Sequence, residues 1–143
     1  MNELNEEPSI VTAHLAPQED RLAYIEKTFG IHFTLAIEAA TYFLTEKMAK
    51  DYHGGFWNYY RLSNSGFYMA PDGEEIYSVS SANYFQGELS SDALGIVSCL
   101  TAYSHLSFSK NEELGRLCAQ QYYLLREYMY AHPEVAVILR AID

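Results

Sequence analysis

Basic residues are scarce in this sequence and are missing from two long stretches. The chain has nine Lys and Arg residues against nineteen Asp and Glu, which gives a net charge of -10. The first twenty residues carry five acids and no Lys or Arg, and no basic residue lies between Arg61 and Lys110. A protein that binds nucleic acid needs basic residues to displace counterions from the phosphates. The composition therefore predicts no direct binding of DNA or RNA.

Long hydrophobic runs are also missing, and cysteine is rare. The acidic start is unlike a secretory signal, which begins with basic residues and continues into an apolar run. The longest mostly apolar run, residues 93–103, is about half the length that a membrane-spanning helix needs. The only cysteines, Cys99 and Cys118, lie in apolar helical patterns. We interpret them as buried free thiols of a cytoplasmic protein without membrane contact, with a disulfide between them as the alternative.

Motifs that mark common enzyme classes do not occur. The sequence has no phosphate-binding loop, dinucleotide fingerprint, metalloprotease helix motif or nucleophile elbow. Its five histidines are scattered, with no two of them three or four positions apart and none near a cysteine, whereas zinc sites usually contain such a close pair. We therefore predict no catalytic residues, no metal site and no cofactor. The alternative is a small enzyme whose active site is assembled from residues distant in the sequence.

What the sequence does contain is enough apolar material for one globular core. Of the 143 residues, 49% are hydrophobic and 15% are aromatic. Residues 1–16 are acidic and have no clear period, so we expect a flexible N-terminal arm. Beyond this arm, helical periodicity and helix-capping residues predict five helices, over residues 17–29, 31–51, 91–109, 111–131 and 135–142.

Between the second and third predicted helices the pattern changes to short strands. Two aromatic-rich segments, 56–62 and 67–70, are separated by Ser63-Asn64-Ser65-Gly66, which is typical of a β-hairpin. Further strands are predicted over 76–80 and 84–88, after the turn at 71–73. Because the strands do not alternate with helices, we predict an α+β fold in which a small antiparallel β-meander of three to four strands packs with about five helices.

Acidic residues of the meander form the first candidate for a partner-binding surface. Asp72, Glu74 and Glu75 lie on one predicted turn, Glu88 lies near the next, and no basic residue is close in sequence. Carboxylates gathered in this way create a local field that attracts a basic protein partner. The alternative is that they only keep the protein soluble.

Aromatic residues of the hairpin form the second candidate. Trp57 and Tyr59 are residue types that often anchor protein interfaces, provided that they stay exposed. The alternative is that these rings, like most of those in the hairpin, pack between helices and fill the core.

Two long segments of the sequence resemble the ArdB/KlcA antirestriction family. The segments are GGFWNYYRLSNSGFYMAPDG, residues 54–73, and NYFQGELSSDALGIVSCLTAYSHLSF, residues 83–108. The family pattern includes an aromatic G-G-F/Y-W segment, L-S-N-x-G-F-Y-M-A-P, S-x-D-A-x-G-I and S-H-L. Ser65 departs from it, because a second glycine is expected at this position.

The resemblance implies a compact α+β antirestriction domain over residues 17–143, encoded on a plasmid or another mobile element. It implies relief of type I restriction–modification through a protein partner, either the restriction enzyme complex or an accessory factor, and not through mimicry of DNA. The family pattern designates no catalytic residues that could be transferred to this chain.

Overall fold

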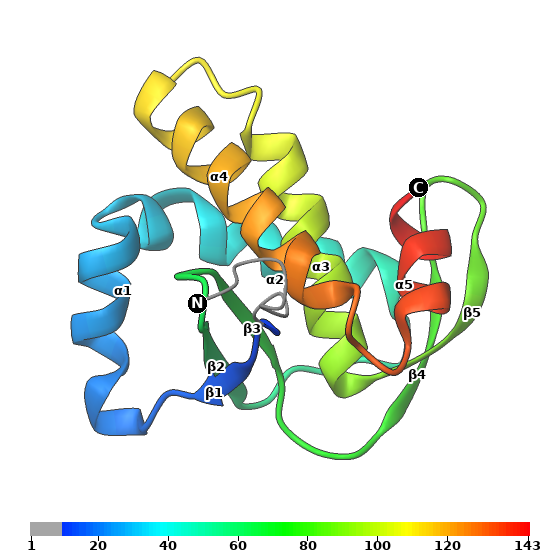
Figure 1. The fold of residues 1–143 in the computed structure, drawn as a ribbon. Helices are drawn as coiled ribbons and strands as arrows, with labels where there is room; N and C mark the ends of the chain where they lie inside the picture. The colour runs from blue at the N-terminus through cyan, green and yellow to red at the C-terminus, as the bar shows by residue number, and fades with distance from the viewer. Residues whose placement is uncertain (1–9) are drawn as a thin grey trace, which may run out of the picture.

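The computed structural model describes residues 10–143, which form five α-helices and two small antiparallel sheets (Figure 1). The α+β class with about five helices is therefore confirmed. In chain order the elements are β1 (Ala13–Leu15), the 3-10 turn η2 (Gln18–Asp20), α1 (Arg21–Phe29), the π-helical turn η3 (Phe33–Ile37), α2 (Glu38–Met48), β2 (Trp57–Leu62), β3 (Phe67–Pro71), β4 (Ile76–Ser80), β5 (Gln86–Ser90), α3 (Ser91–Leu106), α4 (Glu112–Met129) and α5 (Val135–Ile142).

The strands form two separate sheets, so the expectation of one continuous meander is wrong. β2 and β3 pair as the predicted hairpin, and β4 pairs with β5 alone. The chain turns away from the first sheet after Pro71, through Gly73 with φ of 118°, a value that glycine adopts readily. β4 then gains a bridge from Ala49 to Val79 and makes no ladder with β3.

The third strand of the first sheet comes from the predicted N-terminal arm. β1 pairs antiparallel with β2, with His14 opposite Arg61, and Ala16 is buried. Residues 13–16 are therefore an ordered part of the fold, contrary to the prediction of a flexible arm. Residues 1–9 of the predicted arm lie outside the described residues.

Helix α3 is the centre of the core. It contacts β3, α2, α4 and α5, and most of its side chains are fully buried, as Figure 1 shows from its position between the other layers. Such burial explains why this segment is apolar on most sides. Gly95 lets the helix approach β3 closely, since a Cβ placed there would lie 2.4 Å from the Cβ of Ala70.

Polar side chains mark the starts of the two long helices. Ser90 caps α3 by accepting a hydrogen bond from the N–H of Ala93, and Asn111 caps α4 by accepting one from Leu114. Each cap satisfies a backbone donor that would otherwise lack a partner in the helix. The Ser90 cap lies at the position where α3 leaves the β4–β5 hairpin.

Candidate partner-binding site

The turn between β3 and β4 exposes the three acidic residues that the sequence singled out. Asp72, Glu74 and Glu75 are all exposed. Asp72 and Glu75 line a hollow of about 410 Å³, to which Asp51 and His53 contribute from the segment after α2. The structure thus adds a carboxylate from another part of the chain to this acidic turn.

A second hollow adjoins the first. Its volume is about 250 Å³, and it is lined by Asp72, Glu74 and Asp92 of α3. Asp72 lines both hollows, which makes them neighbours on the surface. We call the two hollows together the acidic groove, with Asp51, Asp72, Glu74, Glu75 and Asp92 as its carboxylates.

The carboxylates of the first hollow are held by uncharged donors. Three of them accept one hydrogen bond each: Asp72 from the side-chain amide of Asn58 at 2.9 Å, Asp51 from the N–H of Ser78 at 3.2 Å, and Glu75 from the hydroxyl of Tyr77 at 3.2 Å. No Lys or Arg lines either hollow. Across residues 10–143, the only groove carboxylate that forms an ion pair is Asp92, with His132. The groove therefore presents oriented negative charge, and apart from Asp92 none of its carboxylates is ion-paired within this part of the chain.

Glu88, the fourth acidic candidate, does not line the groove. It lies on β5 opposite Ser78 in the β4–β5 ladder, and its side chain is exposed. The structure therefore places Glu88 near the groove on the neighbouring hairpin without bringing it into either hollow.

Trp57 and Tyr59 are buried, so the expectation that they stay exposed as anchors is wrong. Their exposed fractions are 3% and 8%. The indole N–H of Trp57 donates to the hydroxyl of Tyr52 at 2.7 Å. The ring of Tyr59 packs against Phe67 and lies 3.7 Å from the guanidinium of Arg21. Alternation along β2 turns both side chains toward the helices, where they fill the core.

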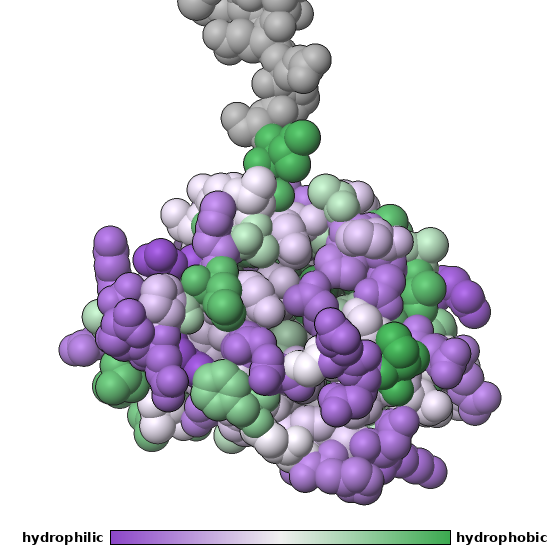
Figure 2. Space-filling model, turned by 90° about the horizontal axis from the view of Figure 1, so that it is seen from below, coloured by the Kyte–Doolittle hydropathy of each residue, from purple (hydrophilic) through white to green (hydrophobic). Residues whose placement is uncertain are grey.

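Exposed aromatic side chains do occur, at positions that the sequence did not single out. Phe56, just before β2, is 51% exposed and lines the first hollow of the acidic groove. Tyr84, in the turn between β4 and β5, is 95% exposed. On the face shown in Figure 2, hydrophobic residues appear as separate spots among hydrophilic ones. The surface at the groove is therefore distinguished by its charge and not by a continuous apolar patch.

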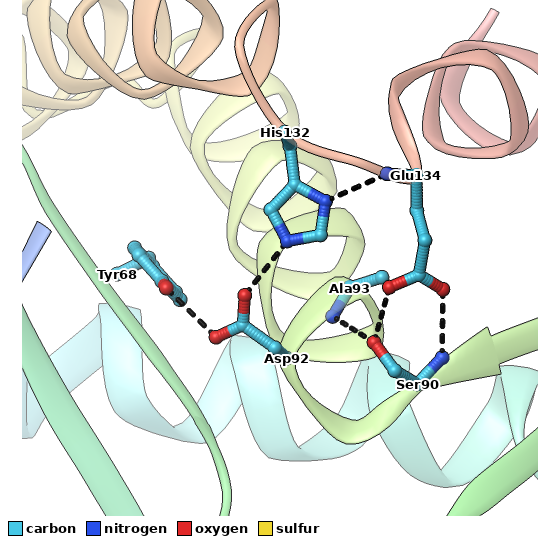
Figure 3. Close-up of polar contacts among 6 residues, drawn as sticks. All are labelled: Tyr68, Ser90, Asp92, Ala93, His132 and Glu134. Atoms are coloured by element: carbon cyan, nitrogen blue, oxygen red, sulfur yellow. Dashed lines mark hydrogen bonds and ion pairs between the residues drawn. The ribbon is translucent and has the colours of Figure 1, made fainter. Parts of the chain in front are cut away.

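A part-buried polar network adjoins the groove and joins β3, α3 and the start of α5 (Figure 3). Asp92 accepts hydrogen bonds from the Tyr68 hydroxyl at 2.7 Å and from Nε2 of His132 at 2.8 Å. Nδ1 of His132 accepts the N–H of Glu134 at 3.0 Å, and the carboxylate of Glu134 accepts the hydroxyl and N–H of Ser90. Burial and the adjacent Asp92 carboxylate raise the pKa of Tyr68 above its usual range.

The geometry of this network fits a structural role, in which it holds β3, α3 and the loop before α5 together. It does not fit a catalytic base. In Ser-His-Asp catalysis the histidine nitrogen that is not bonded to the carboxylate faces a nucleophile. In His132 that nitrogen accepts a backbone N–H, so neither ring nitrogen faces a hydroxyl or thiol. Sequence reasoning missed the pairing, because Asp92 and His132 are 40 residues apart and share no local motif.

Both cysteines are free and buried, as the sequence predicts. Burial raises the pKa of the Cys99 thiol to about 12 and that of Cys118 to about 12. Such thiols stay protonated near neutral pH and are poor nucleophiles. Within residues 10–143, no group of three or more His, Cys, Asp or Glu side chains has an arrangement that could hold a metal ion. None of the helices in that range is long and apolar enough to cross a membrane.

The described residues thus form an acidic α+β protein built around one buried helix, with a charged groove on its surface. The chain belongs to the antirestriction protein family, whose sequence model matches residues 50–143. This match includes the hairpin, the acidic turn and all of α3, α4 and α5.

Relatives extend the similarity over nearly the whole chain. An antirestriction protein KlcA of Escherichia coli is 37% identical over 142 residues, which cover 98% of this chain and 100% of the relative. A second antirestriction protein KlcA of Escherichia coli is 35% identical over 151 residues, covering 95% of this chain and 96% of the relative. The identities are high enough, over enough of each chain, to confirm the resemblance seen in the sequence.

A solved structure has the same fold. It matches with a TM-score of 0.86 and 38% sequence identity, over 97% of this chain and 99% of the other. It comes from a structural study of the KlcA and ArdB proteins. These proteins are described as having a novel fold and antirestriction activity against type I DNA restriction systems in vivo but not in vitro.

Proposed function

We propose that this protein relieves type I restriction in the cytoplasm by binding a protein through the acidic groove. The observation that carries the proposal is the set of exposed carboxylates, Asp51, Asp72, Glu74 and Glu75, around adjacent hollows that no Lys or Arg lines. An arginine or lysine of a partner would meet several carboxylates at once there. Complementary charge of this kind speeds encounter and selects partners.

The hydrogen bonds within the groove support this role. The carboxylates of Asp51, Asp72 and Glu75 are oriented by neutral donors before any partner arrives. Less side-chain entropy is then lost when a cation binds, which favours association. The ring of Phe56 lines the first hollow, and the guanidinium of Arg21 already lies 4.9 Å from its centroid, so the partner's cation would be held by the carboxylates.

The partner is either the type I restriction enzyme complex or an accessory factor. The related solved structure is described with activity in vivo but not in vitro. A contact that needs a component present in cells and missing from a purified reaction would give this behaviour. That difference supports the accessory factor.

We further propose that the protein neither mimics DNA nor acts as an enzyme. A mimic needs regularly spaced carboxylates with few bases among them, whereas α4 carries Glu112 and Glu113 together with Arg116 and Arg126. The net charge of -10 also opposes contact with phosphates. A gel-shift with duplex DNA at micromolar protein should therefore show no complex at physiological salt, and a complex that weakens steeply with added salt would contradict this part of the proposal.

The main experiment is a restriction assay in cells infected with unmodified phage. The variant Asp72→Asn, Glu74→Gln, Glu75→Gln removes three charges from the groove. These residues are exposed, so the loss of stability should stay below about 0.5 kcal/mol for each. The matched control Glu19→Gln, Asp20→Asn, Glu46→Gln removes three exposed charges elsewhere. We expect the groove variant to lose protection of the phage DNA and the control to keep it.

A pull-down from the same cells with both variants identifies the partner. The parent and the control should retain a protein that the groove variant releases. If the groove variant stays folded and protects as well as the parent does, the acidic groove is not the contact surface. Glu88→Gln, on the adjacent hairpin, then tests whether the contact lies on β5.

A further inference from the structure

A second pocket, of opposite charge, lies at the other end of β2. Its volume is about 470 Å³, and it is lined by Lys27, Arg61 and His14, with the hydroxyl-bearing residues Thr28 and Ser65. Among residues 10–143, no Asp or Glu lines it. The strand places it roughly 17 Å from the acidic groove, at about 3.4 Å per residue. We call it the basic pocket.

Two elements bring these side chains together. Tyr24, Lys27 and Thr28 follow helical spacing on one face of α1. His14 and Arg61 are opposite each other in the β1–β2 ladder and therefore share one face of the sheet. The guanidinium of Arg61 lies 5.5 Å from the ring centroid of Tyr24, and Nε2 of His14 lies 2.8 Å from Oγ1 of Thr12. These contacts orient both basic groups beside the pocket.

No acid among residues 10–143 neutralises the positive charge of the pocket. In the part of the chain that the structure describes, neither Lys27 nor Arg61 nor His14 forms an ion pair. The chain has only nine Lys and Arg residues and a net charge of -10. Two of these bases and a histidine lie around one hollow that no carboxylate of the described residues lines. The local charge of the pocket therefore differs in sign from the net charge of the protein.

Ser65 supplies an independent indication. Its φ is 76°, a conformation that favours glycine and costs other residues on the order of 1 kcal/mol or more. The turn holds it there, because its N–H donates to the carbonyl of Leu62 and its carbonyl accepts from the side chain of Gln121. Its hydroxyl makes no hydrogen bond with any residue from 10 to 143 in this structure and lies at the pocket. Strained residues that are held in place by their surroundings are concentrated at binding sites.

We propose that the basic pocket binds a small molecule that carries a phosphate monoester. Such a group has a charge near −2 and three acceptor oxygens, which match an ammonium, a guanidinium, an imidazole and two hydroxyls arranged around one volume. A carboxylate has one charge and two oxygens and would leave donors unused. The volume lies within the range of small-molecule pockets, about 300–1,000 Å³. DNA, a phosphodiester polymer, would in addition meet the negative field of the rest of the protein.

A titration followed by backbone amide NMR tests this directly. Inorganic phosphate and phenyl phosphate are added to the full chain at constant ionic strength, with chloride and acetate as reference anions. We expect saturable shifts of amides in α1, in β1 and around Ser65 with both phosphates, roughly tenfold weaker binding of acetate, and no saturation with chloride. Shifts that spread over the surface without saturation, or equal affinity for acetate and phosphate, would overturn the proposal.

Three variants and one control complete the test. Lys27→Gln and Arg61→Gln are exposed positions that should keep the fold and weaken phosphate binding roughly tenfold each. Lys50→Gln, an exposed lysine outside the pocket, removes the same charge and should leave the affinity unchanged. Ser65→Gly should raise the melting temperature by relieving strain, yet weaken phosphate binding several-fold because the hydroxyl is lost. If Lys27→Gln and Arg61→Gln bind phosphate as the parent does, the pocket is not a phosphate site, whatever the outcome of the restriction assay.

Discussion

His132 and Asp92 are 40 positions apart in the sequence and are joined by a hydrogen bond of 2.8 Å between Nε2 and Oδ2. Through this bond the loop before α5 is tied to the first turn of α3, and Tyr68 adds β3 to the same carboxylate. Three elements that meet beside the acidic groove are thus fixed by one aspartate. The stability of this part of the fold should therefore depend on the histidine.

His132→Ala should lower the free energy of unfolding by about 2–3 kcal/mol. The substitution removes a buried imidazole. It also leaves the part-buried Asp92 carboxylate without its histidine donor and the N–H of Glu134 without its acceptor, and polar groups that lose a partner in this way are costly. Urea unfolding followed by circular dichroism gives the difference. His53→Ala, at an exposed histidine, is the control and should change stability by less than about 0.5 kcal/mol. Equal stability of the two variants would show that the bond contributes little.

Gly95→Ala should destabilise the protein although alanine favours helices. The added Cβ would meet the Cβ of Ala70 at 2.4 Å and the carbonyl oxygen of Met69 at 2.4 Å, where α3 packs on β3. Overpacking of this kind costs about 1–3 kcal/mol or more, which exceeds the gain in helix propensity of about 1 kcal/mol. Gly115→Ala in α4, whose nearest contact would be the carbonyl of Ser107 at 3.0 Å, should cost less. Thermal unfolding of both variants checks the order.

Stability should fall as the pH rises from about 9 to about 12. The thiols of Cys99 and Cys118 have a folded-state pKa of about 12, against an ordinary value of 9.0. The unfolded chain therefore loses these protons first, and the stability that is fully present below pH 9 is lost as the pH approaches 12. For Cys99, which is almost fully buried, the slope approaches at most about 1.4 kcal/mol per pH unit.

Cys99→Ala is the variant that isolates this effect. Its unfolding free energy, measured in urea at several pH values, should decline less steeply above pH 9 than that of the parent. Tyr103 is also buried with a raised pKa, so part of the decline will remain. A parent whose stability is constant from pH 8 to pH 11 would contradict the expected burial of both thiols.

The fluorescence of Trp57 should show directly that this residue is buried, because it is the only tryptophan of the chain. With 3% exposure and its N–H donated to Tyr52, it should emit at short wavelength and resist quenching by acrylamide. Unfolding in urea should shift the emission to longer wavelength and make quenching efficient. Strong quenching in the native protein would mean that Trp57 is available to a partner after all.

Local sequence was sufficient for most of the individual elements, with β1 as the exception. The Ser63-Asn64-Ser65-Gly66 turn closes the β2–β3 hairpin as predicted, and Ser90 and Asn111 cap their helices. Gly30, with φ of 59°, ends α1. Each of these features depends on residues within a few positions of one another, so that side-chain chemistry and backbone preference act without help from the rest of the chain.

The candidate site was predicted only in part for the same reason. The acidic turn at Asp72 is a local feature, and its carboxylates are exposed as a turn requires. The packing of α2, α3 and β5 decides that Asp51 and Asp92 line the acidic groove with this turn and that Glu88 does not. Sequence spacing contains no information about such neighbours.

The sequence by itself thus determined the helices, the hairpins, the acidic turn and, through two long motifs, the family. Tertiary structure alone decided that β1 completes the first sheet, that β4 and β5 form a second one, and that Trp57 and Tyr59 face the core. It also decided that negative charge collects at one end of β2 and positive charge at the other. The physical reason is that strand pairing, burial and the fields of charged groups are set by residues that are close in space, and folding brings these together from distant parts of the chain.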